Sequence, residues 1–77
     1  METIDLRGIC CPTNFVRAKL ALEEIEADTE VEILLDDGEP VKNLPKSLIS
    51  EGHKLLGLTE DEAGFYRLRI LTVALEE

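Results

Sequence analysis

The alternation of apolar and polar residues predicts strands and helices in turn along the first half of the chain. Residues 3–7 alternate, with Ile4 and Leu6 on one side and polar residues on the other, which is the period of a half-buried strand. Residues 12–25 place apolar side chains three and four positions apart, which predicts an amphipathic helix. Residues 30–35 alternate again and predict a second strand, which an Asp-Asp-Gly turn ends.

The second half predicts another helix followed by two strands. Apolar residues recur at helical spacing at Val41, Leu44, Leu48 and Ile49. Gly52 is placed to end this helix, and Pro45 removes one internal hydrogen bond, so we expect a kink there or a helix that begins near Pro45. Residues 54–59 and 65–74 predict two strands, and the polar stretch 60–64 between them suits a hairpin.

The order of elements is therefore β-α-β-α-β-β, in a single domain that spans residues 1–77. Both helical connections are long enough to return the chain over the sheet. We expect an α/β two-layer sandwich, in which a four-stranded mixed sheet carries two helices on one face. The other face then presents alternating charged residues, which we interpret as a solvated surface with pairs across strands. These residues include Glu30, Glu32, Arg67 and Arg69.

Composition narrows the functional classes. The 77 residues include 17 acidic and 8 basic side chains, for a net charge of −9, which disfavours direct binding to nucleic acid. No apolar run approaches the roughly 20 residues that cross a bilayer, and the N-terminus lacks a basic segment followed by an apolar one. We therefore expect a cytoplasmic protein without membrane contact.

The two cysteines, Cys10 and Cys11, are adjacent, so a bond between them would close no loop that constrains the unfolded chain. Free thiols in a reducing compartment are the consistent interpretation. Pro12 suits the first turn of the helix, which puts Cys11 at or beside its N-cap. Unpaired backbone N–H groups and the helix dipole stabilise a thiolate there and lower the pKa of a thiol.

Charge along the chain favours the same site. The stretch from Leu6 to Leu22 has no acidic residue and carries three positive charges, in a chain that is acidic elsewhere. A thiolate in this stretch avoids repulsion by neighbouring carboxylates in the sequence. The sequence thus predicts a reactive thiol at Cys11. The alternative is that both cysteines are small buried hydrophobic residues, and this alternative is stronger for Cys10.

The stretch Asp5-Leu6-Arg7-Gly8-Ile9-Cys10-Cys11-Pro12 resembles the D-x-R-G-x-x-C-P signature of the TusA/SirA-like sulfur-carrier proteins. The resemblance extends over nearly the whole chain, through Asp36-Asp37, the Pro40 region, Leu44-Pro45 and the final hairpin. It implies two helices on a four-stranded sheet and a sulfane sulfur held on Cys11 as a persulfide. The donor would be a cysteine desulfurase or a rhodanese-like protein, and the acceptor a protein of tRNA thiolation, molybdenum-cofactor synthesis or sulfur metabolism. No cofactor is implied.

The residues around Cys11 receive accessory roles from this resemblance. Asp5 and Arg7 would frame the cysteine, or form a plain cross-strand pair. Pro12 would begin the helix. Asn14 stands where the family's C-P-x-P motif has its second proline, so we expect a normal helix start but altered partner contacts at its tip. Cys10 is a second departure from the family pattern and would supply a resolving thiol, although a ring between adjacent cysteines is strained.

Other chemistry has less support in the sequence. A zinc site built from His53, Cys10 and Cys11 would need a fourth ligand, so we expect no metal site and interpret His53 as a residue near a helix C-terminus. Transfer of a soft metal on the cysteine pair ranks last. The main rival to a sulfur carrier is a non-catalytic protein-interaction or redox-sensing module with the same fold, which needs no reactive thiolate.

Overall fold

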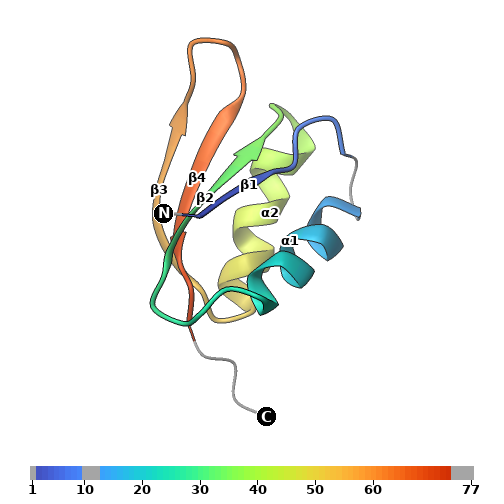
Figure 1. The fold of residues 1–77 in the computed structure, drawn as a ribbon. Coiled ribbons are helices and arrows are strands. Elements are labelled where there is room, and N and C mark those ends of the chain that lie inside the picture. The colour runs from blue at the N-terminus through green and yellow to red at the C-terminus, as the bar shows by residue number, and fades with distance from the viewer. Residues whose placement is uncertain (1, 10–12, 74–77) are drawn as a thin grey trace.

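The computed structural model describes residues 2–9 and 13–73 of the chain. Within them the order of elements is the predicted one, with two helices and four strands (Figure 1). The elements are β1 (Glu2–Asp5), α1 (Thr13–Glu23), β2 (Glu30–Leu35), α2 (Glu39–Ser50), β3 (Lys54–Glu60) and β4 (Tyr66–Leu71).

The four strands form one mixed sheet in the order β1-β2-β4-β3. β1 runs parallel to β2, whereas β4 is antiparallel to both β2 and β3. Both helices lie on the same face of this sheet, and the β3–β4 hairpin extends beyond it at one end (Figure 1). The predicted two-layer α/β sandwich is confirmed.

The core lies between the sheet and the two helices. Alternation in β2 directs Val31, Ile33 and Leu35 toward the helices, and all three are fully buried. The buried apolar residues are Leu6, Ala18, Leu22, Val31, Ile33, Leu35, Leu44, Leu48, Leu68 and Ile70. Burial of each of the larger side chains stabilises the fold by roughly 1.5–3 kcal/mol.

The opposite face of the sheet carries charged side chains, as predicted. Glu32 faces Arg69 in the strand register but forms its ion pair with the diagonal neighbour Arg67, at 3.1 Å between Oε1 and Nη1. Arg67 also contacts Asp61 at 3.0 Å. The predicted pairing across strands is confirmed for Glu32.

Strand β3 forms one edge of the sheet and leaves three leucines exposed. Leu55, Leu56 and Leu58 have 42% to 46% of their surface accessible. The pairing with β4 shifts register between Leu55 and Gly57, so that Leu56 has no partner in the ladder. The edge is therefore apolar but irregular.

Helix α2 begins before Pro45, near which one of the two predicted alternatives placed its start. It begins at Glu39, with Pro40 in the first turn and an acidic residue at the positive end of the dipole. The predicted start near Pro45 is wrong, because Pro45 lies inside the helix and is buried among the residues that face the core. This burial offsets part of the cost of the hydrogen bond that proline cannot donate.

The other boundaries differ by a few residues. β1 spans Glu2–Asp5 rather than 3–7, and the chain then turns at Arg7 and Gly8, where Gly8 takes a positive φ of 80°. α1 ends at Glu23, and the amide of Ile25 donates to Leu22 in a tighter turn. β4 ends at Leu71, and Thr72 contacts the loop that precedes β2.

Candidate functional site

The predicted site residues Cys10, Cys11 and Pro12 lie outside the described residues, so their roles stay predictions. The structure describes both flanks of this segment. On one side the chain leaves β1 and reaches Ile9, and on the other Thr13 begins α1. The two flanks lie toward the end of the sheet from which the β3–β4 hairpin extends (Figure 1).

The flank that follows β1 is hydrogen-bonded to residues at the end of β2. The amide of Leu6 donates to the carbonyl of Leu34 at 2.9 Å, and the Leu6 side chain is buried in the core. The amide of Gly8 donates to Asp36 Oδ2 at 2.6 Å, across 28 residues of sequence. Because a positive φ is strained for other residues, glycine allows the turn that aims this amide at Asp36.

Asp5 and Arg7, both predicted accessory residues, bind each other. Arg7 Nε and Nη2 donate to the two carboxylate oxygens of Asp5 at 2.9 Å and 2.8 Å, and the Arg7 amide donates to Oδ1 at 3.1 Å. The Arg7 side chain and amide hold the pKa of the Asp5 carboxyl at about 2. The pair spans the end of β1 and so is not the cross-strand pair that we considered as an alternative.

An aromatic residue that the sequence analysis missed lies beside this pair. Phe65 precedes β4, and its ring centre is 4.5 Å from Arg7 Cζ and 5.2 Å from Arg67 Cζ. Both guanidinium groups therefore contact one aromatic ring. An aromatic residue between the polar hairpin and a strand with alternating arginines was the available signal.

On the other flank, Asn14 lies in the first turn of α1, as predicted. Its side chain is only 1% exposed, and neither amide atom has a hydrogen-bond partner among the residues that the structure describes. The side chain faces inward on the same stripe as Ala18 and Leu22. Asn14 is therefore an interior residue and does not itself present a surface to a partner.

The positive charges of the predicted basic stretch lie mainly at the surface. Arg17 is exposed on α1, and Lys19 reaches Glu51 after α2, with 3.6 Å between Nζ and Oε1. The first turn of α1 contains no acidic residue. The positive end of this helix thus keeps its capacity to stabilise an anion.

His53 follows α2, as predicted, and its amide donates to the carbonyl of Leu48. The residue is 7% exposed, and burial lowers the pKa of the imidazole below its ordinary value of 6.5. Within residues 2–9 and 13–73, no group of three His, Cys, Asp or Glu side chains converges as metal ligands would. Over the same residues, no helix has the length and apolar character that a membrane span requires.

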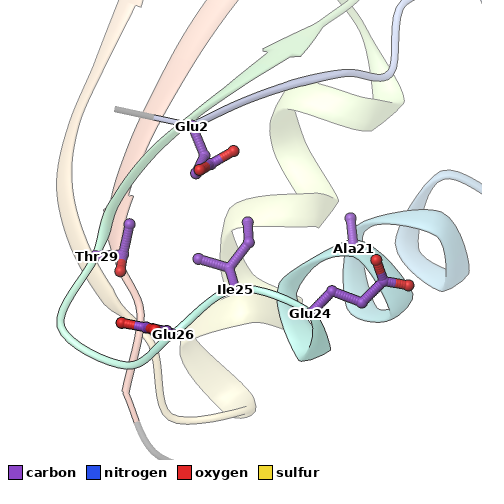
Figure 2. A pocket seen from close by; sticks show the side chains of 6 residues that line it. All are labelled: Glu2, Ala21, Glu24, Ile25, Glu26 and Thr29. Carbon is purple, nitrogen blue, oxygen red and sulfur yellow. The ribbon is translucent and has the colours of Figure 1, made fainter.

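An open hollow of about 450 Å³ lies at the other end of the sheet from this site. Figure 2 shows the residues that line it, which come from the start of β1, the end of α1 and the loop before β2. They are Glu2, Ala21, Glu24, Ile25, Glu26 and Thr29. Three carboxylates make this hollow unsuited to an anionic sulfur group, because like charges repel.

Comparison with protein families gives a match over nearly all of the chain. The model of the family described as sulfurtransferase TusA matches residues 2–72. The chain belongs to the TusA family. The predicted resemblance, which was drawn from the D-x-R-G-x-x-C-P signature, is confirmed.

Individual relatives of this TusA-family chain agree with the assignment. A candidate sulfur carrier protein of Archaeoglobus fulgidus is 35% identical over 57 residues, which cover 74% of this chain and 65% of that protein. The sulfur carrier protein TusA of Pseudomonas entomophila is 30% identical over 64 residues, or 83% of this chain and 79% of that protein. The chain thus spans just under two thirds of the length of the Archaeoglobus relative.

The solved structures give the same fold. The crystal structure of a SirA-like protein from Desulfitobacterium hafniense matches this chain with a TM-score of 0.79 and 33% sequence identity. The match covers 96% of this chain and 100% of that one. The two-helix, four-stranded architecture is therefore the architecture of a solved member of the group.

Proposed function

We propose that this chain is a sulfur carrier that accepts a sulfane sulfur on Cys11 and passes it to a protein acceptor. Membership of the TusA family and relatives named as sulfur carriers support the role. The signature assigns the sulfur to Cys11, two residues before Thr13 begins α1. The donor in this proposal is a cysteine desulfurase or a rhodanese-like protein.

The transfer requires only thiol exchange. The Cys11 thiolate attacks the terminal sulfur of a cysteine persulfide on the donor, the donor's S–S bond breaks, and its cysteine leaves as a thiolate. Cys11 then carries the persulfide. A thiolate of the acceptor attacks the terminal sulfur in turn, and Cys11 is released as a thiolate. Each step forms one sulfur–sulfur bond and breaks another, so no external oxidant or reductant is needed.

The observation that carries the proposal is the charge arrangement around the cysteine segment. Asp5 is bound by Arg7, and Asp36 accepts the amide of Gly8, so both carboxylates that contact the flank after β1 are engaged in hydrogen bonds. The first turn of α1 adds no acidic side chain. A thiolate or persulfide anion placed between these flanks gains from the helix N–H groups.

The proposed thiol exchange at Cys11 needs no second catalytic group. A carrier must present its sulfur to two different proteins, so the sulfur needs an accessible position rather than an enclosed pocket. Activation by a helix N-terminus requires no histidine partner. His53, which follows α2, has no part in the proposed transfer.

The test is sulfur loading. The full chain is incubated with a cysteine desulfurase and cysteine, and mass spectrometry is expected to find one added sulfur that a reductant removes. Cys11→Ala is expected to abolish the addition, whereas Cys10→Ala is expected to retain it. Sulfur uptake by the Cys11→Ala variant would contradict the site.

Sulfur loading and alkylation of the same proteins also distinguish a sulfur carrier from the rival function. A wild-type chain that takes up no sulfur, and whose Cys11 reacts with iodoacetamide as slowly as an ordinary thiol, would favour a non-catalytic interaction module. The sulfur-carrier proposal instead expects both loading and fast alkylation.

A further inference from the structure

The Phe65 ring joins two parts of the chain that are far apart in sequence. It lies just before β4, while Arg7 follows β1, and the guanidinium of Arg7 is 4.5 Å from the ring centre. The guanidinium of Arg67 approaches the same ring at 5.2 Å. We call this set of three side chains the arginine–phenylalanine stack.

Carboxylates hold both cations of the stack in place. Asp5 binds Arg7 through two side-chain hydrogen bonds, and Asp61 accepts from both Nε and Nη2 of Arg67. Asp61 in turn accepts the amide of Ala63, which fixes the hairpin that precedes Phe65. The ring is therefore contacted by two arginines whose guanidinium groups are oriented by hydrogen bonds.

The stack and the core together restrain the chain just before the cysteines. Leu6 is buried, Arg7 contacts the stack, and the amide of Gly8 is held by Asp36. Ile9 packs against the core, and its amide donates to the carbonyl of Leu6. Of these restraints, the contact with Phe65 is the one that comes from the β3–β4 hairpin.

We propose that Phe65 is a positioning residue for the sulfur-bearing cysteine, because it fixes Arg7 and, through it, the chain that leads to Cys11. The inference rests on the proposed function and deepens it. A cysteine at a helix N-terminus is activated only while its sulfur stays near the helix N–H groups. Loss of the ring leaves Arg7 bound to Asp5 but removes the contact that connects this pair to the β3–β4 hairpin, and the thiolate then samples a wider range of positions.

The test is the alkylation rate of Cys11 with iodoacetamide as a function of pH. Cys10→Ser is present in every protein, so that a single thiol reacts. Phe65→Leu keeps an apolar side chain of similar size but removes the ring, and we expect the rate at pH 7 to fall about fivefold, with the midpoint of the pH profile moved upward. Phe65→Tyr keeps the ring and is expected to restore the wild-type rate and midpoint.

The matched control is Tyr66→Leu, which removes the adjacent aromatic ring. Tyr66 packs against the core and is not part of the stack, so its loss is expected to lower stability while leaving the pH midpoint of the folded protein unchanged. A Phe65→Leu variant with the wild-type midpoint and rate would overturn the proposal. So would a Phe65→Tyr variant that behaves like Phe65→Leu.

A double-mutant cycle isolates the contact between Arg7 and Phe65. We expect Phe65→Leu to lower the alkylation rate at least threefold less in the Arg7→Gln protein than in the protein that keeps Arg7. Fully additive effects would contradict a role that acts through Arg7. Because iodoacetamide replaces the sulfur donor, these results are independent of sulfur loading, and a wild-type chain that takes up no sulfur would refute only the proposed function.

Discussion

The carboxylates at the two ends of the sheet have different surroundings. Near the flanks of the cysteine segment, Asp5, Asp36 and Asp61 each accept hydrogen bonds from nearby side chains or amides. At the opposite end, the carboxylates line an open hollow and form no ion pair with the other residues that the structure describes. The carboxylates that line the hollow are those of Glu2, Glu24 and Glu26.

Under the proposed function, the difference bears on how a chain of net charge −9 would hold an anionic sulfur group. Total charge is a poor guide to the local potential when some carboxylates are bound to cations and amides and others face water. Asp5, Asp36 and Asp61 help to hold the framework around the flanks of the cysteine segment together. Variants at the two ends test this division.

The largest effect is expected at the acidic end, where Thr72 is 1% exposed. Its hydroxyl accepts the amide of Thr29 at 3.0 Å and donates to the carbonyl of Glu26 at 2.8 Å. Thr72→Val keeps the shape but leaves these groups unpaired, so we expect the free energy of unfolding in urea to fall by about 2 kcal/mol.

Thr72→Ser retains the hydroxyl and serves as the control for that variant. In both folded proteins we expect Cys11 to react with iodoacetamide at the wild-type rate, because this end has no part in the proposed site. A slower reaction of Cys11 with iodoacetamide in Thr72→Val would contradict the idea that the two ends of the sheet act independently.

A smaller loss is expected for Asp36→Ala, which removes the acceptor of the Gly8 amide. We expect the free energy of unfolding to fall by about 1 kcal/mol and the Gly8 amide to exchange faster with deuterium. Asp37→Ala is the control, since among the residues that the structure describes Asp37 accepts only the amide of its neighbour Gly38. Equal effects at the two positions would show that the link to Gly8 adds no stability.

Asn14→Leu is expected to act in the opposite direction. The buried amide of Asn14 has no partner among the described residues, so an apolar side chain of similar size should raise the free energy of unfolding by about 1 kcal/mol. Asn14→Ala would instead leave a cavity and is expected to give no gain. A loss of stability in Asn14→Leu would mean that the amide is satisfied in the native protein.

The smallest effect concerns pH. The pKa of Asp5 is lowered from 3.8 to about 2 by Arg7, so the folded state binds this proton less readily than the unfolded chain. The resulting stabilisation is complete above pH 3.8 and is lost as the pH falls toward 2. It is modest because the pair is exposed to solvent.

NMR titration of the Asp5 carboxyl measures this shift directly. In Arg7→Gln the pKa of Asp5 is expected to return toward 3.8, whereas in Phe65→Leu it is expected to stay low. A return toward 3.8 in Phe65→Leu would mean that the ring, and not the arginine alone, is needed to hold the Asp5–Arg7 pair.

The sequence was sufficient for the order of elements, the mixed sheet and the helix layer, because alternation in residues 30–35 and helical spacing around Leu44 report directly on burial. It was less informative about boundaries. The start of α2 at Glu39 depends on the burial of Pro45 against the core, which is a tertiary effect that local propensity does not contain.

The site was predictable in part. Asp5 and Arg7 could be named from the sequence because they belong to a signature, and their hydrogen bonds connect residues only two positions apart. The partners Asp36 and Phe65 could not be named, since they approach through pairing of β1 with β2 and of β2 with β4. The burial of Asn14 likewise depends on how α1 packs on the sheet.

The irregular edge of the sheet affects how the chain behaves at high concentration. Three exposed leucines on an open strand are a template to which another extended segment can add, as in fibre formation. The unpaired residue Leu56 interrupts the regular spacing of backbone groups, so a neighbouring strand can pair with only short stretches on either side of it. The same irregularity therefore limits edge-to-edge aggregation of the protein.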